Sequence, residues 1–234
     1  MKEPLIILTG PTAVGKTHLS IALAKAVGGE IISADSMQVY KHMDIGSAKI
    51  MPQEMDGVRH YLVDELEPFE EFHVVRFQEM ARAAMKEIRS RGHIPILVGG
   101  TGFYIQALLY DIDFTEQECD SAYRRQLEEL AETRGNHYLH EMLKAVDPAS
   151  AEAIHENNRK RVIRALEFYH ESGERISEHN ERESQKTSPY NFAYFVLNDD
   201  REKLYRRIDA RVDAMVKAGL VDEVARLQQM GCHA

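Results

Sequence analysis

The first half of the chain alternates short apolar runs with longer segments in which apolar residues recur at helical spacing. The apolar runs, typical of buried strands, lie at residues 5–9, 30–36, 60–63 and 94–98. The segments of helical spacing lie at residues 18–27, 74–89 and 103–109. Strands that alternate with helices in this way predict a parallel α/β sheet flanked by helices.

The pattern changes after an acidic segment at residues 111–120, where we place a domain boundary. Apolar residues then keep helical spacing through residues 123–146, with a break at Gly135, and again through residues 159–170. Residues 178–189 are charged and end in a proline, so we expect a linker there.

The α/β pattern returns with an apolar strand at residues 190–197, followed by two helical segments in residues 201–230. We therefore predict a discontinuous α/β core, residues 1–112 and 190–234, interrupted by an all-helical insertion domain, residues 113–189. A chain of 234 residues is long enough for both.

Composition narrows the cellular compartment and the classes of binding partner. The two cysteines have no C-x-x-C neighbour, which argues against a disulfide framework or a cysteine zinc site, and no apolar run reaches membrane-spanning length. We expect a cytoplasmic monomer. The net charge of −9 argues against a general nucleic-acid coat, but it leaves room for a local basic surface at residues 159–164 or 201–211. Ordinary solvated helix faces are the alternative for both.

One motif carries specific chemistry. Residues 10–17 fit G-x-x-x-x-G-K-[ST], between a strand and a helix, which is the P-loop pattern. In this loop backbone N–H groups surround phosphate oxygens, the lysine adds a positive charge, and the following hydroxyl binds Mg²⁺. The candidate phosphate-binding residues are Gly10, Thr12, Ala13, Val14, Gly15, Lys16 and Thr17, and Thr17 is the candidate metal ligand.

Two further strand ends face the same edge of the predicted sheet, where ligands of α/β proteins bind. Asp35 and Ser36 follow the second strand, so Asp35 is a candidate general base or Mg²⁺ partner, or a cap for the next segment. Residues 99–102 read Gly-Gly-Thr-Gly, without the metal-binding carboxylate of many P-loop hydrolases. Thr101 could donate to a phosphate oxygen there, and a tight turn explains the glycines equally well.

These segments together resemble the tRNA dimethylallyltransferase family. The resemblance is carried by residues 10–17, 33–40 (Ser-Ala-Asp-Ser-Met-Gln-Val-Tyr), 46–49 (Gly-Ser-Ala-Lys), 98–104 (Val-Gly-Gly-Thr-Gly-Phe-Tyr), 161–167 and the spaced positions of 201–224. It extends over nearly the whole chain, in family order and spacing. Family members continue beyond the region that matches residues 219–230, with a motif of the type Q-x-I-G-Y-K-E, so we expect that C-terminal part to be missing here.

The resemblance implies a P-loop NTPase-like core and the transfer of a dimethylallyl group from dimethylallyl diphosphate to N6 of adenosine 37, in tRNAs that read codons beginning with U. It implies Mg²⁺ as cofactor, Asp35 as the base, and Thr101 as a group that orients the leaving oxygen. It also implies a flipped adenine and an insertion domain that grips the anticodon stem-loop. The tRNA-binding residues would be Asp35, Ser36, Met37, Gln38, Thr101, Lys160, Arg161, Val162, Ile163 and Arg164.

Three other functions stay open on the residues alone. A small-molecule or nucleotide kinase would use the insertion as a lid and Asp35 to deprotonate an acceptor. A prenyltransferase that acts on free adenine nucleotides would share the same site. A non-catalytic RNA-binding module is the weakest alternative, because it would not need the P-loop.

Overall fold

The computed structural model describes residues 2–114 and 121–232, which form two compact units. The first unit comprises Met1–Ile112 and Ser188–Ala234, and the second comprises Asp113–Thr187. The boundaries expected from the sequence lie within two residues of these. Cys119 and most of the acidic segment around it lie outside the described residues. No helix in the described part of the chain is both apolar enough and long enough to cross a bilayer.

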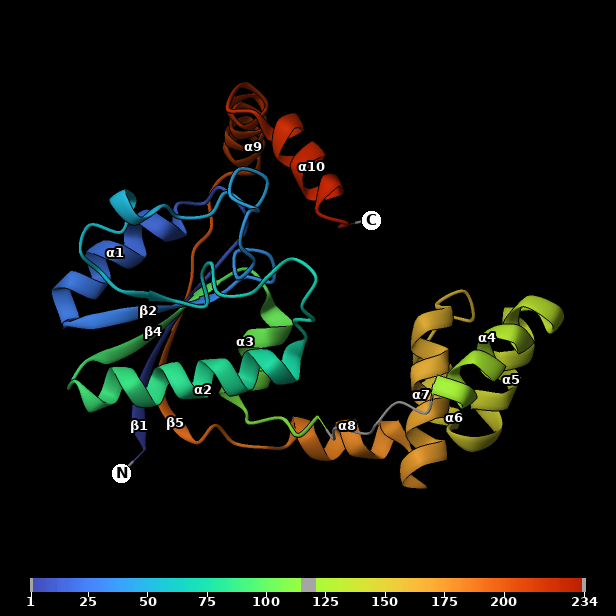
Figure 1. Ribbon diagram of the computed structural model, residues 1–234. Coiled ribbons are helices and arrows are strands. Elements are labelled where there is room, and N and C mark those ends of the chain that lie inside the picture. Colours follow the sequence, from blue (N-terminus) through green and yellow to red (C-terminus); the bar gives the residue numbers. More distant parts are fainter. Residues whose placement is uncertain (1, 115–120, 233–234) are drawn as a thin grey trace. The chain divides into compact units, whose positions relative to one another are not determined.

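A parallel sheet of five strands forms the centre of the first unit (Figure 1). The strands are β1 (Glu3–Thr9), β2 (Gly29–Ala34), β3 (His60–Tyr61), β4 (Ile94–Gly99) and β5 (Tyr190–Val196). Their order is β3-β2-β4-β1-β5, and every neighbouring pair is parallel. The predicted α/β fold class is confirmed.

Alternate side chains of the strands pack against helices on opposite faces of the sheet. One face carries α2 (Val74–Ser90) and α3 (Gly102–Leu109), which bury Ile7 and Ile32. The other face carries α1 (Lys16–Val27), which packs with Ile31 and Ile96. Burial on both faces explains why these strands read as continuous apolar runs.

The register brings the carboxyl ends of three strands to one edge. Gly99, the last residue of β4, pairs with Thr9 of β1 and with Ala34 of β2. A Cβ atom on Gly99 would collide with the Ala34 carbonyl group, so only glycine allows this close approach. The segments that follow β1, β2 and β4 therefore start side by side.

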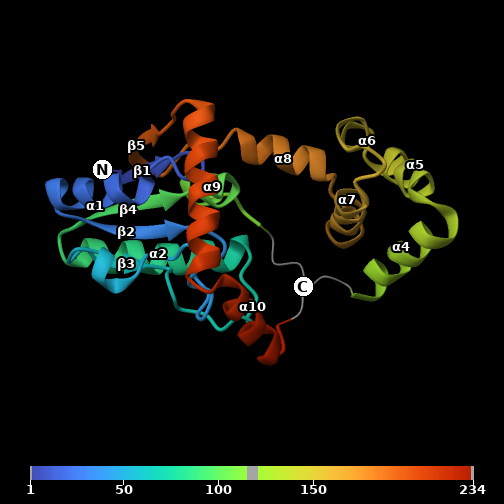
Figure 2. The ribbon, with the colours of Figure 1, turned by 90° about the horizontal axis from the view of Figure 1, so that it is seen from above.

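Two C-terminal helices, α9 (Arg201–Lys217) and α10 (Leu220–Gln229), lie beyond this edge of the sheet (Figures 1 and 2). Asp200 caps α9 by accepting hydrogen bonds from the backbone N–H groups of Glu202 and Lys203, at 3.0 and 3.2 Å. Gly219 has a φ of 101° between the two helices, in a turn that returns α10 toward the segment after β2. That segment contains only the short 3-10 helix Pro52–Glu54 besides β3.

The second unit is helical. It comprises α4 (Ser121–Arg134), α5 (Asn136–Val146), α6 (Pro148–Ala153), α7 (Arg159–Ser172) and α8 (Ile176–Ser184). Its core is a separate apolar cluster that includes Leu127, Leu139, Leu143, Val162 and Leu166.

The prediction of a linker at residues 178–189 is wrong for the first half of this segment, which belongs to α8. The charged residues that suggested a solvated linker form ion pairs within α8 and with the residues just before it. Arg182 bonds Glu174 at 2.5 Å, and Arg175 bonds Glu178 at 3.2 Å. Glu183 is buried and accepts a hydrogen bond from the Asp113 backbone N–H at 2.8 Å. Charged residues are good helix formers when they are paired, and composition alone does not show the pairing.

A buried carboxylate stabilises the opposite edge of the sheet, where β2 begins. Glu30 is 6% exposed and accepts hydrogen bonds from Arg91 Nε at 3.1 Å, His93 Nδ1 at 2.5 Å and the Tyr61 hydroxyl at 3.1 Å. Burial by itself would raise the pKa of Glu30, but these hydrogen bonds outweigh it and lower that pKa below its usual value. The fold therefore favours the ionised form.

We expect Glu30→Gln to lower the free energy of unfolding by about 1–3 kcal/mol near neutral pH, because buried donors lose a charged acceptor. A depressed carboxyl pKa stabilises the fold above the unfolded-chain pKa of about 4.3, and this contribution disappears as the pH falls through the folded-state value. Urea unfolding should therefore show a wild-type advantage that shrinks in acid. Glu79→Gln, on the exposed face of α2, is the control. A difference that stays constant with pH would contradict the assignment.

Candidate active site

A pocket of about 550 Å³ lies at the carboxyl edge of the sheet. We call it the phosphate pocket. Its walls come from the P-loop, the end of β2, the loop after β2, and α9. The lining residues are Thr12, Ala13, Val14, Gly15, Lys16, Thr17, Asp35, Met37, Gln38, Gly46, Ser47, Ala48, Ile208, Arg211, Val212 and Met215. Of the P-loop candidates, Gly10 alone is not among these residues.

The P-loop bends sharply just before α1 begins. Ala13 and Gly15 have positive φ angles of 64° and 97°, and Gly15 is the residue that precedes α1. No side chain caps α1, so its first N–H groups remain directed toward the pocket. This end of the helix combines free N–H donors with the positive end of the helix dipole, which suits a phosphate group.

Three charged side chains meet at the pocket. Lys16 Nζ donates to the carbonyl oxygens of Gly10 and Pro11, both at 2.8 Å. Burial lowers the pKa of Lys16 below its ordinary value, the Asp35 carboxylate opposes this change, and the Arg211 cation adds to it. An anion bound between Lys16 and Arg211 would relieve their mutual repulsion, so the pair is suited to a phosphate.

Asp35 is held by the segment that follows it. Its Oδ1 accepts hydrogen bonds from the backbone N–H groups of Met37 and Gln38, at 2.9 and 3.3 Å. Within residues 2–114 and 121–232, no donor bonds its Oδ2. The capping role considered from the sequence is therefore present, and one carboxylate oxygen stays available to a ligand.

The face of α9 that lines the pocket is mostly apolar. Ile208, Val212 and Met215 are spaced at i, i+4 and i+7, so they share one side of the helix with Arg211 beside them. The pocket thus has a cationic region at the P-loop and an apolar wall opposite. A ligand with an anionic head and a small apolar group matches both.

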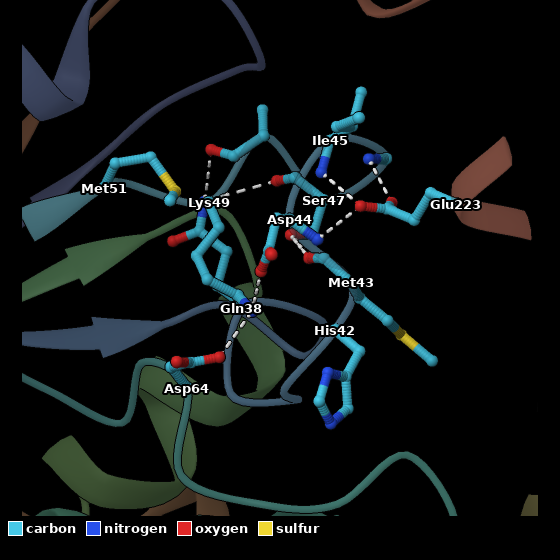
Figure 3. A network of polar contacts seen from close by, with 12 residues as sticks. Gln38, His42, Met43, Asp44, Ile45, Ser47, Lys49, Met51, Asp64 and Glu223 are labelled. Carbon is cyan, nitrogen blue, oxygen red and sulfur yellow. Dashed lines mark hydrogen bonds and ion pairs between the residues drawn. The ribbon is translucent and has the colours of Figure 1, made fainter. Parts of the chain in front are cut away.

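The loop after β2 forms the third wall, and Figure 3 shows its polar contacts. Gln38 Nε2 donates to the carbonyl oxygens of Ser47 and Ala48, at 3.3 and 3.2 Å. Lys49 is nearly fully buried and bonds Asp44 at 2.6 Å and Asp64 at 2.8 Å. Because no hydrogen bond to the Gln38 side-chain oxygen is found in residues 2–114 and 121–232, this oxygen is available to a ligand.

Two other sequence candidates lie near the pocket without lining it. Thr101 precedes α3, and its backbone N–H donates to the Ala34 carbonyl oxygen at 3.2 Å, so it adjoins Asp35 through the backbone. Ser36 is half-buried beside Asp35. Neither side chain belongs to the pocket lining, so the roles expected for them stay predictions.

The remaining candidates belong to α7 in the second unit. Lys160 and Arg161 are exposed, and Arg164 is half-buried. Val162 and Ile163 are 0% and 2% exposed, because they lie on the core face of the amphipathic helix. Their side chains therefore pack in the core of the unit and could contact RNA only through the backbone, and the tRNA-binding role expected for these two residues stays a prediction.

The pocket residues are compatible with Mg²⁺. This ion takes one or two protein oxygen ligands and completes its shell with substrate phosphates and water. The Thr17 hydroxyl and the Asp35 carboxylate are two suitable oxygen donors among the lining residues. The described residues contain no cluster of three or more His, Cys, Asp or Glu side chains that could hold a metal by themselves. A metal here would depend on the bound phosphate.

Sequence reasoning did not assign Arg211 to this site. Residues 201–211 read as a basic helix face, with no feature to separate one arginine from the others. In the structure Arg207 pairs with Asp199 at 2.9 Å, whereas Arg211 makes no ion pair within the described ranges and lines the pocket.

The fold and the pocket define a P-loop α/β protein with a pocket whose residues suit a small phosphorylated ligand. The IPP transferase family model matches residues 38–234, and the isopentenyl transferase model matches residues 3–68. The chain belongs to the IPP transferase family. The family resemblance expected from the sequence is confirmed.

Similar proteins agree with this assignment. The tRNA dimethylallyltransferase of Lachnoclostridium phytofermentans is 64% identical over 229 residues, which cover 98% of this chain and 73% of that protein. The crystal structure of the full-length tRNA isopentenylpyrophosphate transferase of Bacillus halodurans has a TM-score of 0.68 at 46% identity, covering 98% of this chain and 71% of that one. A eukaryotic dimethylallyltransferase acting on tRNA has a TM-score of 0.83 at 33% identity, covering 97% of this chain and 56% of that one.

Proposed function

We propose that this chain transfers a dimethylallyl group from dimethylallyl diphosphate to N6 of adenosine 37 in tRNAs that read codons beginning with U. The observation that carries the proposal is the phosphate pocket, which is lined by the P-loop and Asp35 together with Arg211 and the apolar residues of α9. The diphosphate fits the cationic end, and the five-carbon group fits the apolar wall. Family membership supports the same chemistry.

The reaction forms a bond between N6 and the first carbon of the dimethylallyl group while the bond from that carbon to the diphosphate oxygen breaks. The amine is a weak nucleophile because its lone pair is delocalised into the adenine ring. Asp35 takes the proton that N6 loses, through a carboxylate oriented by the Met37 and Gln38 N–H groups.

The charge that develops on the leaving diphosphate is stabilised by groups already in place. The N–H groups at the start of α1 and the ammonium group of Lys16 lie at the P-loop side of the pocket, and Arg211 adds a cation from α9. Mg²⁺, held by Thr17 and the substrate phosphates with Asp35 nearby, would add charge neutralisation. The absence of a carboxylate at residues 99–102 fits this chemistry, because no water has to be activated.

We propose that the second unit binds the anticodon stem-loop, chiefly by shape and phosphate contacts. Its exposed basic residues on α7 give this acidic chain a local surface for RNA. The target adenine would have to leave its stack to reach the pocket. We also propose that the protein is a monomer and acts in the cytoplasm.

The test is incorporation of radiolabelled dimethylallyl diphosphate into an anticodon stem-loop that contains A36 and A37. We expect label in this RNA and none in a matched stem-loop with G at position 37. Label transferred to AMP in place of RNA would favour a prenyltransferase of free nucleotides, and ATP consumption with a small acceptor would favour a kinase. Either result, with unlabelled stem-loop, would overturn the proposal.

The role of α7 can be measured separately. We expect Arg161→Gln and Arg164→Gln each to weaken binding of the stem-loop and to flatten its salt dependence, by a slope of roughly 0.7 to 0.9 for each RNA phosphate that is no longer neutralised. Lys144→Gln removes an exposed charge of the same unit, from α5, and should leave the slope unchanged. Slopes equal to that of the wild type in both arginine variants would remove α7 from the RNA interface.

A further inference from the structure

Glu223 makes an unusual contact for a residue of a C-terminal helix. It is 3% exposed, and its carboxylate accepts three hydrogen bonds from consecutive backbone N–H groups. Oε2 accepts from Asp44 and Ile45, both at 2.8 Å, and Oε1 accepts from Gly46 at 2.9 Å (Figure 3). Hydrogen bonds to an ionised acceptor are stronger than neutral ones, so this contact holds α10 firmly to the loop after β2.

The packing around the contact leaves little room for a side chain at position 46. A Cβ atom on Gly46 would lie 3.2 Å from Leu220 Cδ1 and 3.4 Å from Glu223 Oε1. The loop itself is fixed by the buried Lys49, which pairs with Asp44 and Asp64. Glu223 therefore bonds a rigid part of the loop, and α10 is the element that the contact positions.

The elements joined by Glu223 are two walls of the phosphate pocket. Residues 46–48 of the loop line the pocket directly. On the other side, α10 follows α9 after the turn at Gly219, and α9 carries Arg211 and Met215 into the lining. The start of α9 has its own anchors, because Leu204 is buried and Arg207 donates to the Ala13 carbonyl oxygen at 3.5 Å. The second half of α9 is held to the loop through α10.

We propose that Glu223 is a positioning residue of the phosphate pocket: its carboxylate fixes α10 to residues 44–46 and thereby holds Arg211 and the apolar face of α9 over the P-loop. The inference rests on the proposed function in taking the prenyl diphosphate as the ligand of this pocket. Without the contact, the fraction of molecules with α9 in place falls, and apparent affinity falls in proportion.

A graded series of variants tests this role. Glu223→Gln keeps one acceptor oxygen and presents an NH₂ group to the remaining N–H donors, whereas Glu223→Ala removes every acceptor. Asp222→Asn is the matched control, because it removes a neighbouring, exposed charge from the same first turn of α10.

Two readouts are needed. Hydrogen exchange of the backbone N–H groups of residues 44–46 should be slowest in the wild type and the control, faster in Glu223→Gln and fastest in Glu223→Ala. The Kd for inorganic diphosphate and the KM for the prenyl donor should rise in the same order, by about tenfold in Glu223→Ala. The kcat should change less than the KM, because a saturating donor restores the state with α9 in place and Asp35 is untouched.

Unchanged exchange at residues 44–46 in Glu223→Ala would overturn the contact itself. Faster exchange with a diphosphate Kd equal to that of Asp222→Asn would show a stabilising contact without a positioning role, and would also overturn the proposal. Failure of the proposed function is distinguishable: a wild type that binds inorganic diphosphate but labels no RNA would reject prenyl transfer, while the exchange and diphosphate measurements still decide the role of Glu223.

Discussion

Replacing Asp35 with asparagine should abolish most turnover, with kcat lower by about 10²- to 10⁴-fold, the range expected for removal of a general base. Asparagine is the informative substitution because it keeps an Oδ1 acceptor for the Met37 and Gln38 N–H groups, and so preserves the turn that Asp35 caps. It removes the carboxylate charge, and with it the ability to take the N6 proton. Single-turnover transfer of radiolabel to the stem-loop measures the effect.

The stem-loop Kd should stay within a few-fold of the wild-type value in Asp35→Asn, since the variant removes chemistry and keeps the shape of the site. Glu30→Gln is a suitable control, because Glu30 begins the same strand, β2, at the opposite edge of the sheet. It should lower stability and leave kcat near wild type. If Asp35→Asn retained turnover within about fivefold, well below the effect of removing a general base, Asp35 would be a turn residue only.

Removal of either pocket cation should be nearly as damaging. We expect Lys16→Met and Arg211→Gln each to lower kcat/KM for the prenyl donor by about 10²- to 10³-fold, because each stabilises charge that grows on the leaving diphosphate. The lowered pKa of Lys16, caused by burial and partly by Arg211, shows that the two cations share one electrostatic environment. Their effects should therefore not be additive in the double variant.

Lys25→Gln provides the control for this pair. Lys25 is exposed in the last turn of α1, at the far end of the helix that begins with Lys16, and it pairs with Asp56. It should leave kcat/KM unchanged. A wild-type kcat/KM in Arg211→Gln would mean that the diphosphate is held by the P-loop alone, and would remove α9 from the donor site.

Much of the core follows from local patterns. Apolar runs and glycines act locally on the backbone, so they predict the strand, P-loop and helix at residues 5–27 correctly. Apolar spacing likewise predicts helices of the second unit. The predictions are less accurate where they rest on composition and not on the spacing of apolar residues. Composition predicts a linker at residues 178–189, although most of α8 lies there, because composition does not show ion pairs. Composition also marks residues 159–164 as a basic run, whereas helical spacing separates the exposed basic positions of α7 from Val162 and Ile163 on its core face.

The sequence by itself determined that this chain carries a phosphate-binding loop at residues 10–17, that Asp35 follows a neighbouring strand, and that an α/β core is interrupted by helices. Each of these depends on residues close together in the chain. Only the tertiary structure decided that Arg211, and not Arg207, lines the pocket at the P-loop, and that Glu223 bonds residues 44–46, which lie 177 to 179 positions away. The physical reason is that both contacts join residues far apart in the chain, which the sheet register brings together. The partners of Glu223 are backbone N–H groups, which every residue type except proline carries, so no sequence pattern distinguishes them.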